Sequence, residues 1–152
     1  MATTLTASTL KVIVKEEINL NGKKHEYRQE QSIADVNMIA QRIVRVPTTV
    51  KTILSFASSI GAGTYHNSDV KYIRVTNLDN ENYITLGLMD TSGDTAYFKL
   101  DKGETMVFYN TNIETKTDGA VFATFSDVDT INTQANQNPV DIEVFVASSQ
   151  SS

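Results

Sequence analysis

The 152-residue sequence contains no cysteine and no tryptophan, and it has only two prolines and seven glycines. Without cysteine, no disulfide, zinc–thiolate site or thiol nucleophile can form, so stability must come from a packed core and backbone hydrogen bonds. No apolar run approaches the length that a membrane-spanning helix needs. A chain of this size can bury one sizeable core without crosslinks, and we therefore expect a single domain.

Basic residues are few and are scattered along the chain. Lysine and arginine total 13 against 18 aspartates and glutamates, which gives a formal net charge of −5. Nucleic-acid binding depends on clustered cations that face phosphates, so this distribution disfavours a nucleic-acid partner. Residues 1–10 hold neither a cationic nor an apolar stretch, and no secretory signal is predicted. No membrane partner is expected, and we place synthesis in the cytoplasm.

The densest strand pattern covers residues 70–107, where short alternating segments follow one another without a helical period. Aromatic and β-branched residues are spread through these segments, as strands favour. The fold class predicted is all-β: a single antiparallel β-sandwich, jelly-roll-like, built from regularly spaced strands and polar turns. The segments predict four strands joined as a meander, at residues 70–76, 83–89, 96–100 and 105–110.

The first hairpin has the clearest local signal. Residues 10–20 alternate and end at Asn21-Gly22, a dipeptide suited to the positive φ of a two-residue turn. The returning segment, residues 24–33, is strongly polar, which favours an edge or solvent-facing strand. Further strands are expected at residues 42–46, 50–56, 120–125 and 140–147.

The remaining segments predict loops and arms. Residues 32–43 fit a helical stripe in part and could form one or two helical turns. Residues 57–69 and 126–138 have loop composition, the latter with room for a short helical turn. The small polar ends predict flexible arms around the sandwich. The organisation expected is an N-terminal arm (1–9), a β-sandwich domain (10–147) and a C-terminal tail (148–152).

No catalytic or metal-binding pattern stands out. His25 and His66 lack the nearby partners of metal ligands, and a cupin-like enzyme would need a His-x-His pair. Asp127-x-Asp129 could bind calcium, but aspartates in turns ordinarily bond their own backbone. Ser-based hydrolysis lacks its Gly-x-Ser-x-Gly turn, and paired-carboxylate glycoside hydrolysis lacks tryptophan for sugar stacking. We expect no enzyme activity, cofactor or metal.

Candidate partner-contact residues come from the arginines and tyrosines, which interfaces enrich. Arg42 and Arg45 flank an apolar strand and could pair with acids of a neighbouring subunit, although a solvated strand face explains them equally well. Tyr65 and His66 sit in a small-residue loop and could stack on a glycan or a protein, or simply anchor the loop. Tyr83 and Tyr109 complete the stacking surface that a glycan-binding jelly roll would use.

The order of several segments resembles small structural proteins of tailed bacteriophages. The resemblance lies in the composition and order of these segments, and none of them is a catalytic motif. It covers most of the chain and implies no functional residue. The segments that carry it are residues 41–47 (QRIVRVP), 70–79 (VKYIRVTNLD), 98–103 (FKLDKG), 131–136 (INTQAN) and 140–146 (VDIEVFV).

The resemblance implies a virion component without a reaction to perform. It would coat the capsid as a decoration or cement protein, with the major capsid protein as partner and a homo-oligomer as the expected state. A position at the neck or tail, or a receptor- or glycan-binding role, stays open. The lack of cysteine suits assembly in a reducing host cytoplasm before incorporation into the virion.

Overall fold

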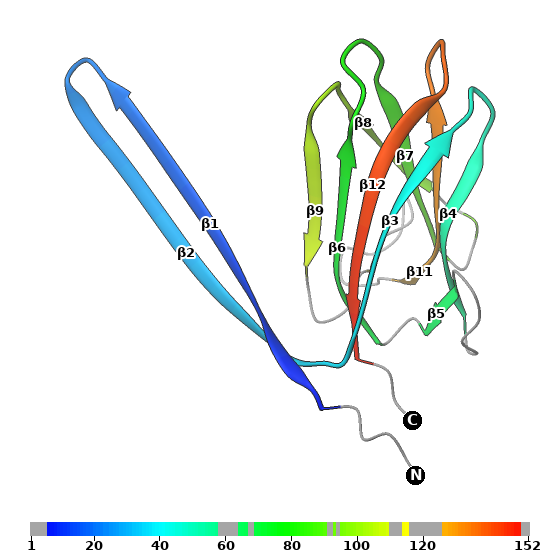
Figure 1. Cartoon of the computed structure of the whole chain (residues 1–152), viewed down its shortest axis with the longest axis horizontal. Coiled ribbons are helices and arrows are strands. Elements are labelled where there is room, and N and C mark those ends of the chain that lie inside the picture. Colours follow the sequence, from blue (N-terminus) through cyan, green and yellow to red (C-terminus); the bar gives the residue numbers. More distant parts are fainter. Residues whose placement is uncertain are drawn as a thin grey trace.

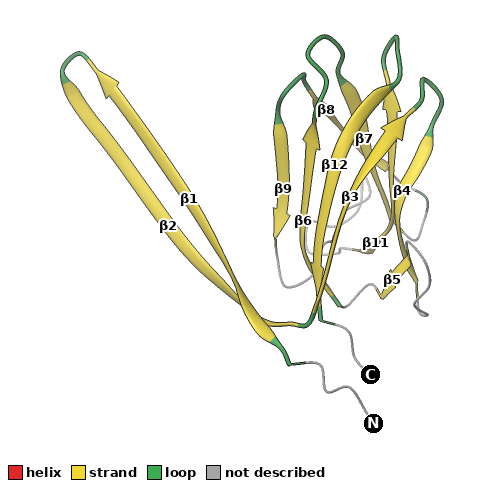
Figure 2. Ribbon diagram, viewed as in Figure 1, coloured by secondary structure: helices red, strands yellow, loops and turns green. Residues whose placement is uncertain are grey.

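The computed structural model describes residues 6–57, 64–66, 69–90, 93, 95–109, 114–115 and 126–149. Within these ranges all regular structure is β-strand and no helix occurs (Figure 2). The strands are β1 (Ser8–Leu20), β2 (Lys23–Val36), β3 (Met38–Val46), β4 (Lys51–Ala57), β5 (Thr64–His66), β6 (Val70–Asn77), β7 (Ile84–Asp90), β8 (Thr95–Leu100), β9 (Thr105–Tyr109), β10 (Glu114–Thr115), β11 (Ser126–Ala135) and β12 (Val140–Ser148).

Strands β3 to β12 form a two-layer sandwich. One layer is a four-stranded sheet of order β3-β12-β6-β9, and the other is a six-stranded sheet of order β5-β4-β11-β7-β8 with β10 on β11. Leaving aside short β5 and β10, the first sheet takes β3, β6, β9 and β12 while the second takes β4, β7, β8 and β11. This alternation between layers is the topology of an eight-stranded jelly roll. The all-β sandwich predicted from the sequence is confirmed.

Strands β1 and β2 form a separate two-stranded sheet that projects from the sandwich (Figure 1). The turn between them is Asn21-Gly22, with φ of 52° and 76°, and it pairs Leu20 with Lys23. Both values lie in the left-handed region that a two-residue hairpin turn requires. The predicted hairpin is therefore confirmed. The range expected for the sandwich began at residue 10, whereas its two sheets draw no described strand from before Met38.

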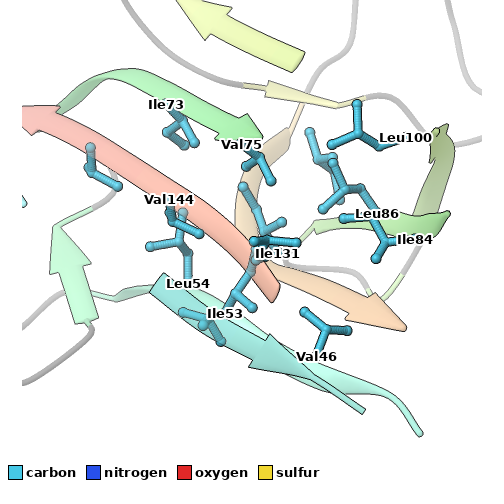
Figure 3. Close-up of a cluster of buried hydrophobic side chains, with 14 of the residues drawn as sticks. Val46, Ile53, Leu54, Ile73, Val75, Ile84, Leu86, Leu100, Ile131 and Val144 are labelled. Atoms are coloured by element: carbon cyan, nitrogen blue, oxygen red, sulfur yellow. The ribbon is translucent and has the colours of Figure 1, made fainter. Parts of the chain in front are cut away.

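The core lies between the two sheets and is built from alternate residues of the central strands. Along β12 the inward positions from Val140 to Val146 are all valine or isoleucine, while Asp141, Glu143 and Phe145 point outward. β6 and β7 supply further buried residues, and Figure 3 shows these side chains filling the space between the layers. The innermost aliphatic side chains are Leu54, Ile73, Val75, Ile84, Leu86, Leu100, Ile131 and Ile142.

Two sequence-based interpretations are wrong. The helical stripe at residues 32–43 belongs to the end of β2 and most of β3, so the competing helix does not form. The segment 126–138, expected to be a loop, contains β11, which runs between β4 and β7 in the six-stranded sheet. Within the predicted loop at 57–69, residues 64–66 form the short strand β5. The strand expected at 120–125 lies outside the described residues.

The four strands expected as a meander all exist, but they do not pair as a meander. Only β7 and β8 are joined as neighbours; β6 pairs β12 and β9 in the other sheet. The connection from β6 to β7 therefore crosses between the two layers. Of the expected arms, residues 1–5 and 150–152 lie outside the described residues, while Ser8 and Ser148 belong to strands.

The β6–β7 connection is held by side chains that bond to backbone. Asn77 is fully buried, and its amide donates to the carbonyls of Asn82 (2.9 Å) and Leu100 (3.3 Å). Asp79 Oδ1 accepts the backbone N–H groups of Glu81 (2.7 Å) and Asn82 (2.6 Å). These bonds, that from Asn82 first, lower the pKa of the Asp79 carboxyl below its ordinary 3.8.

The lowered pKa of Asp79 predicts a contribution to acid sensitivity. A carboxylate with a folded pKa below its unfolded value stabilises the fold at pH above the unfolded pKa. That stability is lost as pH falls through the folded pKa. Asp79→Asn should therefore be less stable than the parent at pH 7, with the gap closing below about pH 4. Urea unfolding from pH 7 to 2 measures this gap, and a gap that stays constant over that range would contradict the assignment.

Candidate interaction surface

The projecting hairpin has two chemically different faces, because its residues alternate and its register is fixed by the Asn21-Gly22 turn. One face carries most of the charge. Lys11 pairs with Glu30 at 2.7 Å, Lys24 lies 3.2 Å from both Glu17 and Glu26, and further pairs join Lys15 to Glu17 and Arg28 to Glu30. The lysines lower the pKa of Glu17, chiefly through Lys15, and of Glu30, chiefly through Lys11. This face is typical of a surface that remains in water.

The opposite face of the hairpin carries most of its apolar side chains, and Glu16, Lys23 and His25 lie among them on the outer half. In the register Leu10 faces Ile33, and Ile18 faces His25. The half nearest the sandwich is partly covered, but farther out Ile18 is 55% exposed and Leu20 is 59% exposed. We call this outer part the distal apolar face; it comprises Val14, Ile18, Leu20 and Tyr27.

Exposed apolar groups on such a hairpin carry a free-energy penalty. Full burial of one large aliphatic side chain stabilises a protein by about 1.5–3 kcal/mol, and the distal apolar face forgoes most of that. An isolated two-stranded hairpin is also only marginally stable in water. A partner that covered this face would gain affinity and would order the hairpin at the same time.

The root of the hairpin is packed against the sandwich. Leu10, Val12 and Ile33 contact a small cluster formed by Val36 of β2, Tyr72 of β6 and Ala147 of β12, together with Tyr109 and Phe145. The rings of Tyr72 and Phe145 meet edge to face, with centroids 5.8 Å apart. This cluster lies on the outer side of the four-stranded sheet, away from the main core. The hairpin is thus anchored through the inner end of its apolar face.

The link between hairpin and sandwich is short. Only Asn37 separates β2 from β3, and its N–H donates to the carbonyl of Ser148 at 3.1 Å. Just before it, Asp35 has φ of 61°, and the pairing of β1 with β2 shifts register between Ser8 and Leu10. A bulge of this kind bends a strand. The bend and the one-residue link together set the direction in which the hairpin leaves the sandwich.

The outer side of the four-stranded sheet continues beyond the root cluster onto β3. Ile39 pairs with Ala147 of the cluster, and Ile43 lies four residues farther along the same face. These side chains are 65% and 69% exposed, the largest values for isoleucine among the exposed apolar residues described. We call Ile39 and Ile43 the β3 patch. In Figure 1 the distal hairpin diverges from the sandwich, so the chain's own hairpin does not cover this patch.

Arg42 and Arg45, both predicted as contact residues, face opposite sides of β3. Arg42 points inward, and its guanidinium donates to the carbonyl of Ile53 in the other layer. An inward charge on an edge strand discourages edge-to-edge pairing with another sheet, which is a structural role. Arg45 points outward, with Nη1 3.4 Å from Asp141 Oδ1, and both side chains are exposed. Arg45 therefore remains available to a partner.

The four aromatic and histidine candidates do not share one surface. Tyr65 on β5 packs against the main core, and burial raises the pKa of its hydroxyl. Beside it, His66 Nδ1 lies 3.9 Å from Asp69 Oδ1. Tyr83 precedes β7, with Lys99 Nζ 4.5 Å from its ring centre. Tyr109 belongs to the root cluster on the other sheet. A common stacking platform from these residues is not formed.

Sequence reasoning missed the residues that the structure places on exposed apolar surfaces. The alternation of residues 10–20 and the Asn21-Gly22 turn predict the hairpin, but the predicted range of the sandwich, 10–147, includes both of its strands. Counting back from the Asn21-Gly22 turn gives the cross-strand register, and that register alone would have placed Ile18, Leu20 and Tyr27 on one face. The β3 patch carries no comparable local signal.

A second surface feature lies on the outer side of the six-stranded sheet. A half-open hollow of about 170 Å³ surrounds Gly87, whose missing side chain leaves room for the Tyr97 ring. A Cβ at position 87 would come within 3.3 Å of that ring. The lining is uncharged, and Asn132, Gln134, Thr85 and Thr95 supply amides and hydroxyls.

In the part of the chain that the structure describes, no group of three or more histidine, aspartate or glutamate side chains is placed to hold a metal ion. No helix in that part is long and apolar enough to cross a membrane.

Comparisons with known proteins assign the chain to no family. No protein-family model matches the chain, and no curated protein matches it. Among solved structures, a chain described under "Bacillus endospore appendages form a novel family of disulfide-linked pili" covers 99% of this chain and 100% of its own length. The TM-score is 0.45 and the sequence identity 9%. A likeness at this level carries no argument about function, and this chain has no cysteine for a disulfide link.

Proposed function

We propose that the chain is a non-enzymatic structural subunit that works by binding other proteins through its projecting hairpin. The observation that carries the proposal is the distal apolar face, which is exposed to solvent. The inner end of the hairpin is packed against the sandwich and contains a β-bulge, and so holds the outer end away from it. Apolar surface rimmed by polar residues is typical of protein–protein contact sites. The ion-paired opposite face would remain in water when the apolar face is covered.

The finer assignment is a virion protein of a tailed bacteriophage that stabilises the capsid shell as a decoration or cement protein. Its support is the resemblance in segment order together with the jelly-roll topology, which occurs among viral capsid domains. The partners would be other virion proteins, the major capsid protein first, and the chain would act as a homo-oligomer assembled in the host cytoplasm. Each bound copy would add a modest binding free energy to the stability of the shell, and a symmetric shell binds many copies. A place at the neck or tail would use the same hairpin.

A particle-binding experiment tests this proposal. Particles of the parent phage that lack the chain are mixed with purified chain, and binding and the temperature of particle rupture are measured. The unsubstituted chain should bind the particles and raise that temperature. The affinity of the variant Ile18→Lys/Leu20→Lys should be at least tenfold lower, because two apolar contacts become charged. Val50→Lys is the matched control: Val50 is 67% exposed but precedes β4, outside the hairpin. Equal binding by the hairpin variant would contradict the proposal.

A second candidate function, glycan binding, has its own observation in the hollow around Gly87. An exposed Tyr97 ring beside neutral amides and hydroxyls is the chemistry that an uncharged sugar needs. The residues differ from Tyr65, His66, Tyr83 and Tyr109, which the sequence suggested. A glycan array with hits that Tyr97→Ala abolishes would favour this function over shell binding, and an array without hits would remove it.

A further inference from the structure

The β3 patch and the hairpin root lie on the same outer side of the four-stranded sheet, with Gln41 between Ile39 and Ile43. Ile39 is the cross-strand neighbour of Ala147, which the hairpin root covers, and Gln41 pairs with Phe145 of the same cluster. The chain thus already packs the inner end of its hairpin face onto this sheet. Beyond the root, the same surface continues uncovered to Ile43.

The distal apolar face has a shape that suits such a surface. A shallow hollow of about 210 Å³ lies on the outer part of the hairpin. Ile18, His25 and Tyr27 border it together with three glutamates, Glu16, Glu17 and Glu26. A hollow of that size admits a branched aliphatic side chain. On β3, Ile39 and Ile43 stand out from the sheet as two such side chains on one face. Their chemistry is that of the root contact, repeated farther from the anchor.

Charge also favours a hairpin-to-sandwich contact between copies. Residues 8–36 carry five basic and five acidic residues, whereas residues 37–152 carry eight basic and thirteen acidic residues. Two acidic sandwiches repel each other, but a neutral hairpin can approach one without that cost. On the docking face the tip adds Lys23, beside Leu20. The target sheet carries Asp141 and Glu143 on its outer side, where they pair with Arg45 and Arg74 of the same chain.

We propose that the distal apolar face of one copy docks on the β3 patch of a second copy. The inference rests on the proposed function and names the first partner of the same hairpin. Because the two surfaces lie on different parts of one chain, two copies can exchange hairpins in a closed two-fold dimer or join head-to-tail. Repeated head-to-tail, the contact builds a closed ring or an open filament, according to whether the rotation between copies closes.

Sedimentation velocity over a concentration series tests the contact. The parent chain should form dimers or larger species as concentration rises. The hairpin variant Ile18→Lys/Leu20→Lys and the patch variant Ile39→Lys/Ile43→Lys should each remain monomeric, because each has lost one of the two surfaces. All four positions are exposed, so circular dichroism should report unchanged folding. Val50→Lys is the control and should assemble like the parent.

A mixture of the two variants gives the sharpest outcome. The hairpin variant keeps an intact β3 patch and the patch variant keeps an intact hairpin, so an equimolar mixture should form a 1:1 dimer and nothing larger. A patch variant that still assembles would show that hairpins meet each other instead, and a monomeric parent or a monomeric mixture would also overturn the inference. If the parent is monomeric while its hairpin is needed for particle binding, the inference fails and the proposed function stands.

Discussion

Replacing Ile131 with alanine is expected to lower the free energy of unfolding by about 4 kcal/mol, because it leaves a cavity at the centre of the sandwich. Ile131 is fully buried on β11, where it pairs with Leu54 of β4 on one side and Leu88 of β7 on the other. Because β4 and β7 flank β11 on both sides, the side chains around Ile131 can move only partly into the cavity. Urea unfolding measures the loss, which for a domain of this size corresponds to a fall in Tm of about 10 °C.

Ile131→Val is the matched control for that substitution. It removes one methylene and keeps the branched shape, so the expected loss is about 1 kcal/mol. A loss below about 1 kcal/mol for the alanine variant would show that β11 is not a central strand. The result therefore tests the element that the sequence reading assigned to a loop.

Strand β11 escaped prediction because its alternation is interrupted. Val128, Ile131 and Ala135 are all buried, but the register shift between Val128 and Thr130 moves the inward positions from even to odd numbers. A buried threonine, Thr133, stands where an aliphatic residue would have revealed the pattern. The composition SDVDTINTQANQN then resembles a loop, although a single bulge explains the phase change.

The partial helical stripe at residues 32–43 has a related origin. Ile33, Val36, Ile39 and Ile43 recur at helical spacing because two strands meet at a bend, not because one helix turns. Asp35 adopts a left-handed conformation, and β3 begins two residues after β2 ends. Apolar residues on two successive strands can add up to a false period of 3.6, and no local signal in the sequence separates the two cases.

Strand positions in the region 70–110 were predictable, but the sheet to which each strand belongs was not. The Asn- and Asp-rich segment after β6 has the composition of a tight hairpin turn, yet it crosses between layers. β6 pairs with β12 and β7 pairs with β11, so each strand's neighbour comes from the far end of the sequence. Pairing is therefore a property of the whole chain. The interaction surface depends on the same global facts, since neither the projection of the hairpin nor the uncovered β3 patch follows from local sequence.

Asn77 provides the second large expected effect. Asn77→Ala should lower the free energy of unfolding by about 2–4 kcal/mol, since it removes the donor to the carbonyls of Asn82 and Leu100 and the acceptor for the N–H of Asp79. The site is completely buried, so water cannot readily replace the lost bonds. The crossing between the layers would then lose the group that ties it to the end of β8.

Two further substitutions decide whether hydrogen bonding or packing is responsible. Asn77→Asp keeps the shape and the acceptor but turns the donor into a second acceptor that faces two carbonyl oxygens, so the loss should be at least as large at pH 7 and smaller once the carboxyl is protonated. Asn77→Leu restores apolar volume without any polar group. If Asn77→Leu lowered the free energy of unfolding by less than about 1 kcal/mol, packing alone would explain the site. The bonds to Asn82 and Leu100 would then not be what fixes the connection between the two sheets.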